Sequence, residues 1–130
     1  MTITMFLEIE TGATLEPIQH VVEKIASAVT VGENSLEGNF SDSNSFFYFE
    51  MVDPPSALAT DGWVVNWLVG VMGVFHCPLH ELESSWNEIK YVMEELSLRT
   101  SERFILSFQF DSVYAFNEGE GVVYKKSMVV

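Results

Sequence analysis

The stretch that most constrains the fold of this chain is a nearly continuous apolar run from Trp63 to Cys77, WVVNWLVGVMGVFHC, which carries no charge. It is shorter than the roughly 18 residues that a membrane-spanning helix needs, and its valines and aromatic residues favour a strand over a helix. We therefore predict that it forms the central strand of a sheet. Because Gly70 and Gly73 lie inside the run, we expect a bulge, a sharp bend or a close backbone approach there.

Both faces of this predicted strand are mostly apolar. Successive side chains of a strand point to opposite faces, so the strand is covered on both sides or passes from one layer to another. One face would carry Trp63, Val65, Trp67, Val69, Val71 and Phe75, and the other Val64, Asn66, Leu68, Met72, Val74 and His76.

The length and composition suit one globular domain. The chain has 130 residues, of which 48% are hydrophobic, so it has enough apolar material for a core and is not disordered. The N-terminal sequence MTITMFLEIE lacks the basic start and cleavage site of a signal peptide, and Cys77 is the single cysteine. We therefore expect a cytoplasmic protein without an internal disulfide.

The charge of the chain is extreme for its size. Nineteen Asp and Glu residues oppose six Lys and Arg residues, which gives a net charge of −13. Nucleic acids and anionic membranes carry the same sign of charge, so we expect neither as a partner. The charge favours a basic protein partner, metal cations or simple solubility.

Hydrophobic periodicity predicts the elements of the N-terminal half. Residues 2 to 10 alternate as a half-buried strand, and helical spacing continues from about Leu15 to Val29. Short strands are expected at Leu36–Phe40 and Phe46–Val52. Asp53–Pro55 should end the latter, because proline cannot donate to a ladder.

In the C-terminal half, a second helix is predicted from Pro78 to about Leu98. A strand at Phe104–Phe110 continues into Val113–Phe116, which forms a hairpin with Val122–Lys125 across a glycine-containing loop. The buried stripe of the second helix would be Leu79, Leu82, Trp86, Ile89, Met93 and Leu96.

The predicted order is strand, helix, three strands, helix, two strands. This order indicates an α+β fold with a single antiparallel, or mixed, sheet and both helices packed on one face. A ferredoxin-like sandwich is the nearest named architecture.

His76, Cys77 and His80 form an H-C-x-x-H motif, the only cluster with soft metal ligands. If these three side chains converge on a zinc ion, they leave one coordination position open, as in catalytic zinc sites. Alternatively, Cys77 is a small buried residue and the histidines end a strand and face solvent. A helix N-terminus would also activate Cys77 as a nucleophile, but no oxyanion hole or orienting residue accompanies it. We assign no catalytic residue and no cofactor, and these three residues are the candidates if a metal binds.

The polar face of the second predicted helix is acidic. Glutamates lie in two rows on it, with an aromatic residue between them. An exposed tyrosine among carboxylates is typical of a binding hot spot for a cationic surface, although charged helix faces are more often simply solvated. The candidate partner-binding residues are Glu81, Glu88, Tyr91, Glu94 and Glu95, with Glu118 and Glu120 of the hairpin loop as a second patch.

With the acidic helix EIKYVMEEL at 88–96 and the acidic loop NEGEG at 117–121, the chain resembles the small immunity proteins that bacteria make against toxins delivered to neighbouring cells. The resemblance lies in length, single α+β domain and strong negative charge, and no residue role is carried over from it. It implies a tight complex with a basic cognate toxin, often a nuclease whose active site or nucleic-acid groove the immunity protein covers.

Two other functions stay open at this stage. A small-ligand-binding, metal-binding or enzymatic domain would use a sheet cavity lined by aromatic residues together with the H-C-x-x-H motif. The residues of this cavity would be Trp63, Trp67, Phe47 and Phe49, with His76, Cys77 and His80. A nucleic-acid mimic that inhibits a DNA-binding protein would rely on the same charge as the immunity protein.

The C-terminal residues carry two further expectations. Lys125 and Lys126 should pair with neighbouring acids or protect an edge strand. The apolar end, Ser127–Val130, would continue the strand or support a homodimer.

Overall fold

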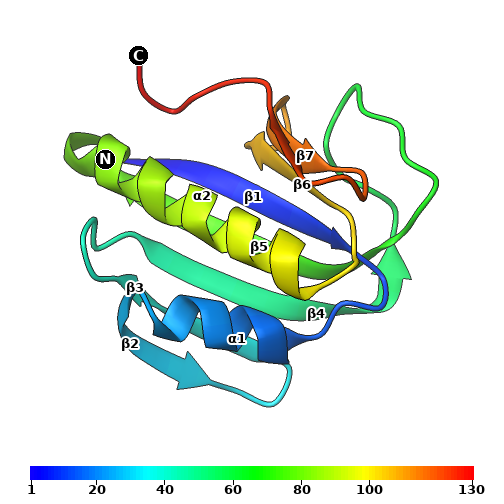
Figure 1. The fold of residues 1–130 in the computed structure, drawn as a ribbon, viewed down its shortest axis with the longest axis horizontal. Helices are drawn as coiled ribbons and strands as arrows, with labels where there is room; N and C mark the ends of the chain where they lie inside the picture. Colours follow the sequence, from blue (N-terminus) through cyan, green and yellow to red (C-terminus); the bar gives the residue numbers. More distant parts are fainter.

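The computed structural model describes residues 1–130 as one eight-stranded antiparallel sheet with two α-helices on the same face (Figure 1). The helices are α1 (Leu15–Glu23) and α2 (Leu82–Arg99), and a single 3-10 turn, η1 (Leu79–Glu81), precedes α2. None of these helices combines the length and apolar composition needed to cross a membrane. The strands are β1 (Thr2–Glu10), β2 (Ala26–Val31), β3 (Ser35–Phe40), β4 (Phe46–Ser56), β5 (Val69–Pro78), β6 (Phe104–Phe108), β7 (Ser112–Asn117) and β8 (Val122–Tyr124).

The N-terminal strand β1 occupies the middle of the sheet. The strand order is β2-β3-β4-β5-β1-β6-β7-β8, so β1 joins two meanders, β2 to β5 and β6 to β8. It pairs with β5 along its whole length, from Thr2 opposite Pro78 to Glu10 opposite Val69. On its other side it pairs with β6. A residue near the middle of β1 is therefore enclosed by backbone on both sides.

The α+β class, the single antiparallel sheet and the helices on one face are confirmed. The predicted element order is wrong, because four strands lie between the helices and three follow α2. The ferredoxin-like arrangement is not confirmed.

One of the extra strands comes from the segment that we expected to complete the first helix. The helix ends at Glu23, and Ala26–Val31 forms β2, which pairs with β3 at the edge of the sheet. This segment contains Val29, Thr30 and Val31, and β-branched side chains favour strands. The prediction of a helix to Val29 is therefore wrong.

The other extra strand arises from a turn at Gln109 and Phe110. Both residues have left-handed φ angles, 51° and 61°, which reverse the chain between β6 and β7. The Phe110 ring stacks on the ring of Phe6, with 3.9 Å between their centroids. Because the chain turns here, the strand predicted from Phe104 to Phe110 ends instead at Phe108. The turn was not predicted, because non-glycine residues rarely adopt this backbone conformation.

Strand β4 continues through Asp53–Pro55 to Ser56, so the prediction that it ends at Val52 is wrong. The prolines nevertheless have their expected effect on pairing. The register with β5 is interrupted between Met51 and Ser56, where no residue of β4 pairs with β5. This interruption lies next to the long β4–β5 loop.

The central apolar run forms a strand only from Val69 onward. The predicted side-chain pattern is also broken at Gly70, since Val69 packs on the face opposite the helices whereas Val71 and Phe75 face them. A Cβ on Gly70 would lie 2.8 Å from the Cα of Thr11, and one on Gly73 would overlap the Phe49 ring. The close backbone approach that we expected is confirmed at Gly70, whereas Gly73 makes room for a side-chain ring.

Two apolar clusters cover the two faces of the sheet. The larger one lies under the helices and contains the fully buried Phe47, Phe49 and Phe75. Most of the predicted α2 stripe belongs to it, but Leu79 is 43% exposed and Leu82 is only partly buried. The smaller cluster, Trp67, Val69, Ile105 and Val113, lies on the opposite face, where no helix covers it.

We expect Gly73→Ala to lower the free energy of unfolding by about 1–3 kcal/mol, because the new methyl group overpacks the Phe49 ring. Urea unfolding measures this loss. In a Phe49→Leu background the same change should cost less, since leucine leaves room beside Gly73. Strictly additive losses in the double variant would contradict this packing.

Candidate functional site

The β4–β5 loop covers the face of the sheet that the helices leave open. It comprises residues 57–68, which contain neither helix nor strand. Trp63, Val65 and Leu58 pack with the smaller apolar cluster on this face. Loops of this length without secondary structure of their own are uncommon in compact domains and are usually functional or disordered. This loop packs on the sheet and forms the candidate site.

A buried glutamate fixes the start of the loop. Glu8, in the middle of β1, is 0% exposed. Its carboxylate accepts hydrogen bonds from the backbone N–H groups of Ala59 and Thr60, at 2.7 and 3.2 Å, and from the Thr60 hydroxyl at 2.5 Å. The Thr60 hydroxyl also lies 3.2 Å from that of Ser107 on β6. These contacts hold residues 59–60 against two adjacent strands.

Thr11, which follows β1, fixes the other end of the loop. Its backbone N–H and its hydroxyl both donate to the carbonyl oxygen of Leu68, each at 2.8 Å. The segment Gly62–Leu68 is thus held at both ends, and we call it the open segment.

The open segment is not a strand, because it begins in a turn at Asp61–Gly62 and bends at Asn66–Trp67. Its side chains alternate: Trp63, Val65 and Trp67 pack inward, whereas Val64 is 95% exposed and Leu68 is 50% exposed. None of its backbone N–H groups donates a hydrogen bond to protein. These backbone N–H groups are therefore unpaired within the chain.

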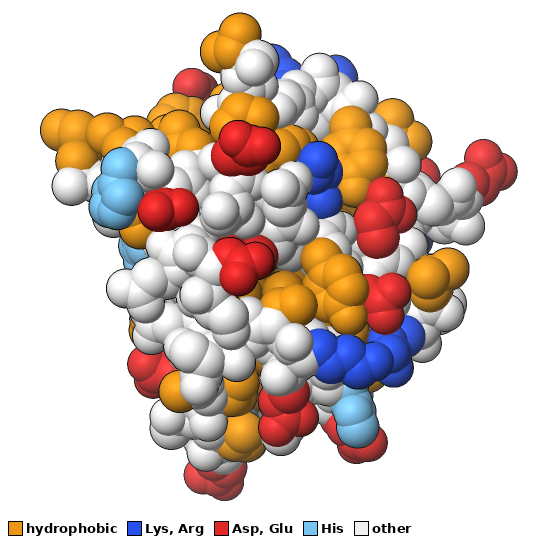
Figure 2. Space-filling model, turned by 60° about the vertical axis from the view of Figure 1, so that its left-hand side comes forward, with side chains coloured by type: hydrophobic (Ala, Val, Ile, Leu, Met, Phe, Trp, Pro, Cys, Tyr) orange, Lys and Arg blue, Asp and Glu red, His pale blue; other side chains and the backbone are white.

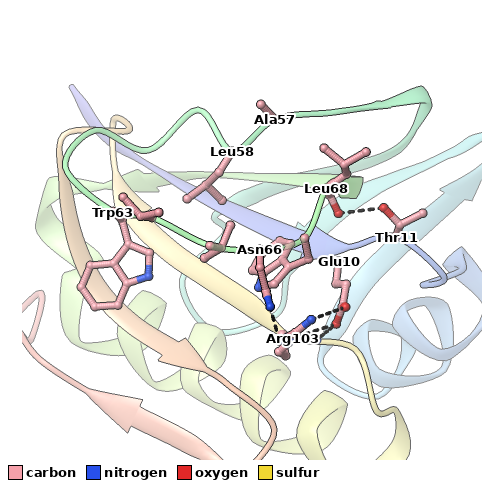
Figure 3. Close-up of a pocket in the computed structure, with 11 residues that line it drawn as sticks. Glu10, Thr11, Ala57, Leu58, Trp63, Asn66, Leu68 and Arg103 are labelled. Carbon is pink, nitrogen blue, oxygen red and sulfur yellow. Dashed lines mark hydrogen bonds and ion pairs between the residues drawn. The ribbon is translucent and has the colours of Figure 1, made fainter.

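A pocket of about 700 Å³ lies between the open segment, Ala57–Leu58 and the end of β1 (Figure 3). Its wall includes Trp63 and Trp67. The indole Nε1 of Trp67 is buried and has no hydrogen-bond partner, although buried polar groups nearly always have one. Trp67 itself is only 7% exposed. Trp67 thus lines the pocket while its indole N–H is buried without an acceptor.

An ion pair closes one end of the pocket. Arg103 donates to both carboxylate oxygens of Glu10, at 3.1 and 2.8 Å, and its backbone N–H donates to Glu10 at 2.9 Å. The guanidinium also donates to the Asn66 side chain at 3.3 Å, so it supports the open segment. Hydrogen bonds from Arg103 lower the pKa of Glu10 below 4.5, and the same contact raises the pKa of Arg103.

The sequence-based predictions found only part of this pocket. Trp63 and Trp67 do line it, but Phe47 and Phe49 are buried under the helices on the opposite face, so the predicted four-residue cavity does not exist. Glu10 and Arg103 were missed. The acid at the end of an alternating strand was their only sequence signal.

The H-C-x-x-H residues do not converge. His76 and Cys77 are neighbours on β5 and point to opposite faces: His76 bonds with Thr4, whereas Cys77 belongs to the core under the helices. His80 is exposed in the turn before α2. No three His, Cys, Asp or Glu side chains are grouped to hold a metal ion, so the predicted zinc geometry is wrong. Burial raises the pKa of the Cys77 thiol, which opposes a nucleophilic role.

Glu88 does not lie on the exposed acidic face that we expected. It is 5% exposed and accepts hydrogen bonds from the backbone N–H groups of Asp42 and Ser43, at 3.0 and 3.2 Å. Beside it, the hydroxyls of Ser45 and Ser85 are 2.7 Å apart in a buried network. Glu88 therefore holds the β3–β4 turn against α2 and is removed from the partner-binding set.

The other candidate acids remain accessible, although two of them have partners within the chain. Glu94 accepts a hydrogen bond from the Tyr124 hydroxyl at 2.7 Å, and Glu95 lies 3.4 Å from Arg99. Burial, and then the Glu94 carboxylate, raise the pKa of Tyr124.

The remaining candidates lie on two parts of the chain, the segment from η1 to α2 and the β7–β8 loop. Tyr91 is partly buried against the core and is not the exposed anchor that we expected. Glu81 is partly exposed, and Glu118 and Glu120 are exposed on the β7–β8 loop. Figure 2 shows acidic side chains separated by neutral and apolar ones on the face it presents.

The two C-terminal lysines form no ion pair with an acid, contrary to one of the alternatives that we expected. Lys125 Nζ lies 4.9 Å from the centre of the Trp63 ring, and Lys126 Nζ lies 5.8 Å from that of Tyr114. Since both residues follow the edge strand β8, the other alternative, protection of an edge, fits their position.

Comparison with protein-family models, with curated proteins and with solved structures finds no match to this chain.

We expect Glu10→Gln to lower the free energy of unfolding at pH 7 by up to about 1 kcal/mol, because it weakens a bidentate ion pair that solvent partly screens. The pKa of Glu10 is lower in the folded state, so its contribution is complete above pH 4.5 and disappears as the pH falls through the folded-state pKa. Urea unfolding measures this effect. The difference in the free energy of unfolding between the variant and the wild type should be smaller at pH 3 than at pH 7.

Glu37→Gln is the control. Glu37 is exposed and forms no ion pair, so this substitution removes the same charge without breaking one. A Glu10→Gln deficit of equal size at both pH values would contradict the account of this ion pair.

Proposed function

We propose that this protein is a cytoplasmic immunity or inhibitor protein that binds and neutralises a basic protein partner, with a nuclease toxin as the expected target. The observation that carries the proposal is the exposure of its negative charge. Seventeen of the nineteen acidic residues, all except Glu8 and Glu88, are at least partly exposed, and only Glu10 and Glu95 form ion pairs.

Unpaired surface carboxylates repel one another and oppose compaction of the chain. Their retention in such numbers is understandable if they act on a partner. The summed field would speed encounter with a cationic surface, and individual carboxylates would occupy the positions that substrate phosphates take on a nuclease.

Within this field, α2 and the β7–β8 loop offer the best-defined contact residues. Tyr124 fixes the position of the Glu94 carboxylate, which lowers the entropy lost when Glu94 binds a cation. The candidate contact set is now Glu81, Glu94, Glu95, Glu118 and Glu120. A nucleic-acid mimic would use the same charges and differs from an immunity protein only in the identity of its partner.

A second candidate function, ligand binding at the β4–β5 loop, is favoured by the pocket beside Trp63 and Trp67. It uses different residues from the acidic set, so the two functions can be tested separately.

The triple variant Glu81→Gln, Glu94→Gln, Glu95→Gln tests the contact set. A partner is first captured from the native lysate at low salt with tagged wild-type protein and identified by mass spectrometry. We expect one basic protein in near-stoichiometric amount, and at least about tenfold slower association of the triple variant in surface plasmon resonance.

The matched control is Glu16→Gln, Glu23→Gln, Glu37→Gln, which removes the same charge from exposed positions on α1 and β3. It should slow association less than the α2 variant does. Equal slowing would show that only net charge matters, and the absence of any basic partner would reject the proposed function.

A further inference from the structure

Part of the helix-free side of the sheet presents aromatic side chains to solvent. Phe6, Phe46, Tyr48 and Phe110 are partly exposed, and they belong to neither of the two apolar clusters. On β4, Phe46 and Tyr48 alternate with Phe47, which is buried under the helices, so they point away from the helices. We call these four residues the aromatic face. Because an uncovered sheet surface normally carries polar side chains, this composition indicates a contact surface.

The strand register makes the aromatic face continuous. Tyr48 on β4 pairs with Val74 on β5, and Val74 pairs with Phe6 on β1. Neighbouring strands lie about 4.8 Å apart, so these three side chains span about 10 Å. Phe46 lies two residues before Tyr48 on the same side of β4, and the Phe110 ring extends the surface beyond Phe6.

Ring stacking fixes the aromatic face before anything binds to it. The centroid of the Phe46 ring lies 6.0 Å from that of His76, and the two planes are 18° apart. The rings of Phe6 and Phe110 are stacked as well, with 17° between their planes. Side chains that are already held in place lose little conformational entropy on binding.

The acidic residues beside the aromatic face are free to accept a partner's hydrogen bonds. The Tyr48 hydroxyl donates to the Glu50 carboxylate at 3.2 Å. Asp61 lies next to Phe110, because its backbone N–H donates to the Phe110 carbonyl oxygen at 2.8 Å, and Asp111 follows Phe110 in the chain. All three acidic residues are exposed and form no ion pair.

No cation of the chain occupies the aromatic face. The sequence has no Lys or Arg from residue 25 to residue 89, and none lies within a strand. Three lysines do lie over aromatic rings, but none of these rings belongs to the aromatic face. One of them, Lys125, lies over Trp63, which contacts Phe116 on β7, two strands away from β1. The rings and carboxylates of the aromatic face are therefore left for an outside cation.

Aromatic rings beside carboxylates favour arginine as the group that binds. A guanidinium lies flat on an aromatic ring, is attracted by the negative face of that ring, and still donates N–H groups to a carboxylate. The ammonium group of lysine is more strongly hydrated and makes no such flat contact. A second copy of this chain, a nucleic acid or an anionic membrane would bring negative charge to a surface that already carries it.

From these observations we infer that the aromatic face is a contact surface for arginine side chains of a basic protein partner. The guanidinium groups lie over the exposed rings of Phe6, Phe46 and Tyr48, and they donate hydrogen bonds to Glu50 and Asp111. This surface goes beyond the proposed function, because it lies outside the acidic contact set of α2 and the β7–β8 loop, and its partner need not be a toxin.

Titration of the isotope-labelled full chain with two synthetic peptides, followed by NMR, tests this surface. One is a capped heptapeptide in which three arginines alternate with glycines, and the other has lysines in place of the arginines. We expect the signals of Phe6, Phe46 and Tyr48 to shift with the arginine peptide, which should bind at least about threefold more tightly than the lysine peptide. Equal affinities, or shifts that spare these three residues, would overturn the inference.

Two substitutions that change no charge complete the test. Phe46→Leu and Tyr48→Leu each remove a ring and keep an apolar side chain, so each should weaken binding of the arginine peptide about two- to fivefold. The matched control is Tyr114→Leu. Tyr114 is also a partly exposed strand residue, but it packs with the core under the helices, and Lys126 already lies over its ring.

Weakening by Tyr114→Leu as large as that by the other two variants, or no effect of Phe46→Leu and Tyr48→Leu, would contradict this surface. Shifts of the same signals that grow with protein concentration in the absence of peptide would assign the aromatic face to a second copy and overturn the inference. Because these variants keep every carboxylate and the test needs no captured partner, a failure here leaves the charge-driven proposed function standing.

Discussion

The arrangement of the open face of the sheet depends on one buried carboxylate. Glu8 lies in the central strand, and an unsatisfied carboxylate there would be strongly destabilising. Three donors from Ala59 and Thr60 satisfy it, so the loop must pass directly over β1. The loop then crosses the face that no helix covers and returns to the sheet at Thr11 and Leu68. The pocket, the open segment and the unused donor of Trp67 all follow from this path.

On the helix-covered face, a second buried carboxylate also holds a connecting segment in place. Glu88 on α2 accepts hydrogen bonds from the β3–β4 turn, next to the buried hydroxyls of Ser45 and Ser85. Two of the acidic residues therefore hold loops in place, and the others create the surface field on which the proposed function depends. The composition alone does not separate these two groups, because both contribute equally to the net charge.

Local sequence patterns were sufficient to predict an element where its structure depends only on residues close to it. The alternation of β1, the stripe of α2 and the glycine loop between β7 and β8 were all predictable, as was crowding at Gly70 and Gly73. The prediction of a strand at Trp63–Leu68 was wrong, because a strand also needs neighbours to pair with, and β1 and β4 end too early to supply them. Similarly, helical spacing places Glu88 on a polar face, and only the distant β3–β4 turn buries it. The separation of His76 from Cys77 follows from strand geometry once both lie on β5.

Glu8 holds the start of the loop, and the backbone of Gly62–Leu68 then stays unpaired until β5 begins at Val69. Residue-resolved amide hydrogen exchange of the free, full-length protein tests it most directly. The account predicts rapid exchange of the amides of residues 62–68 and strong protection through the paired part of β5, from Val71 to Cys77. Protection that continues without a break from Cys77 back to Trp63 would show one long strand and would contradict the account.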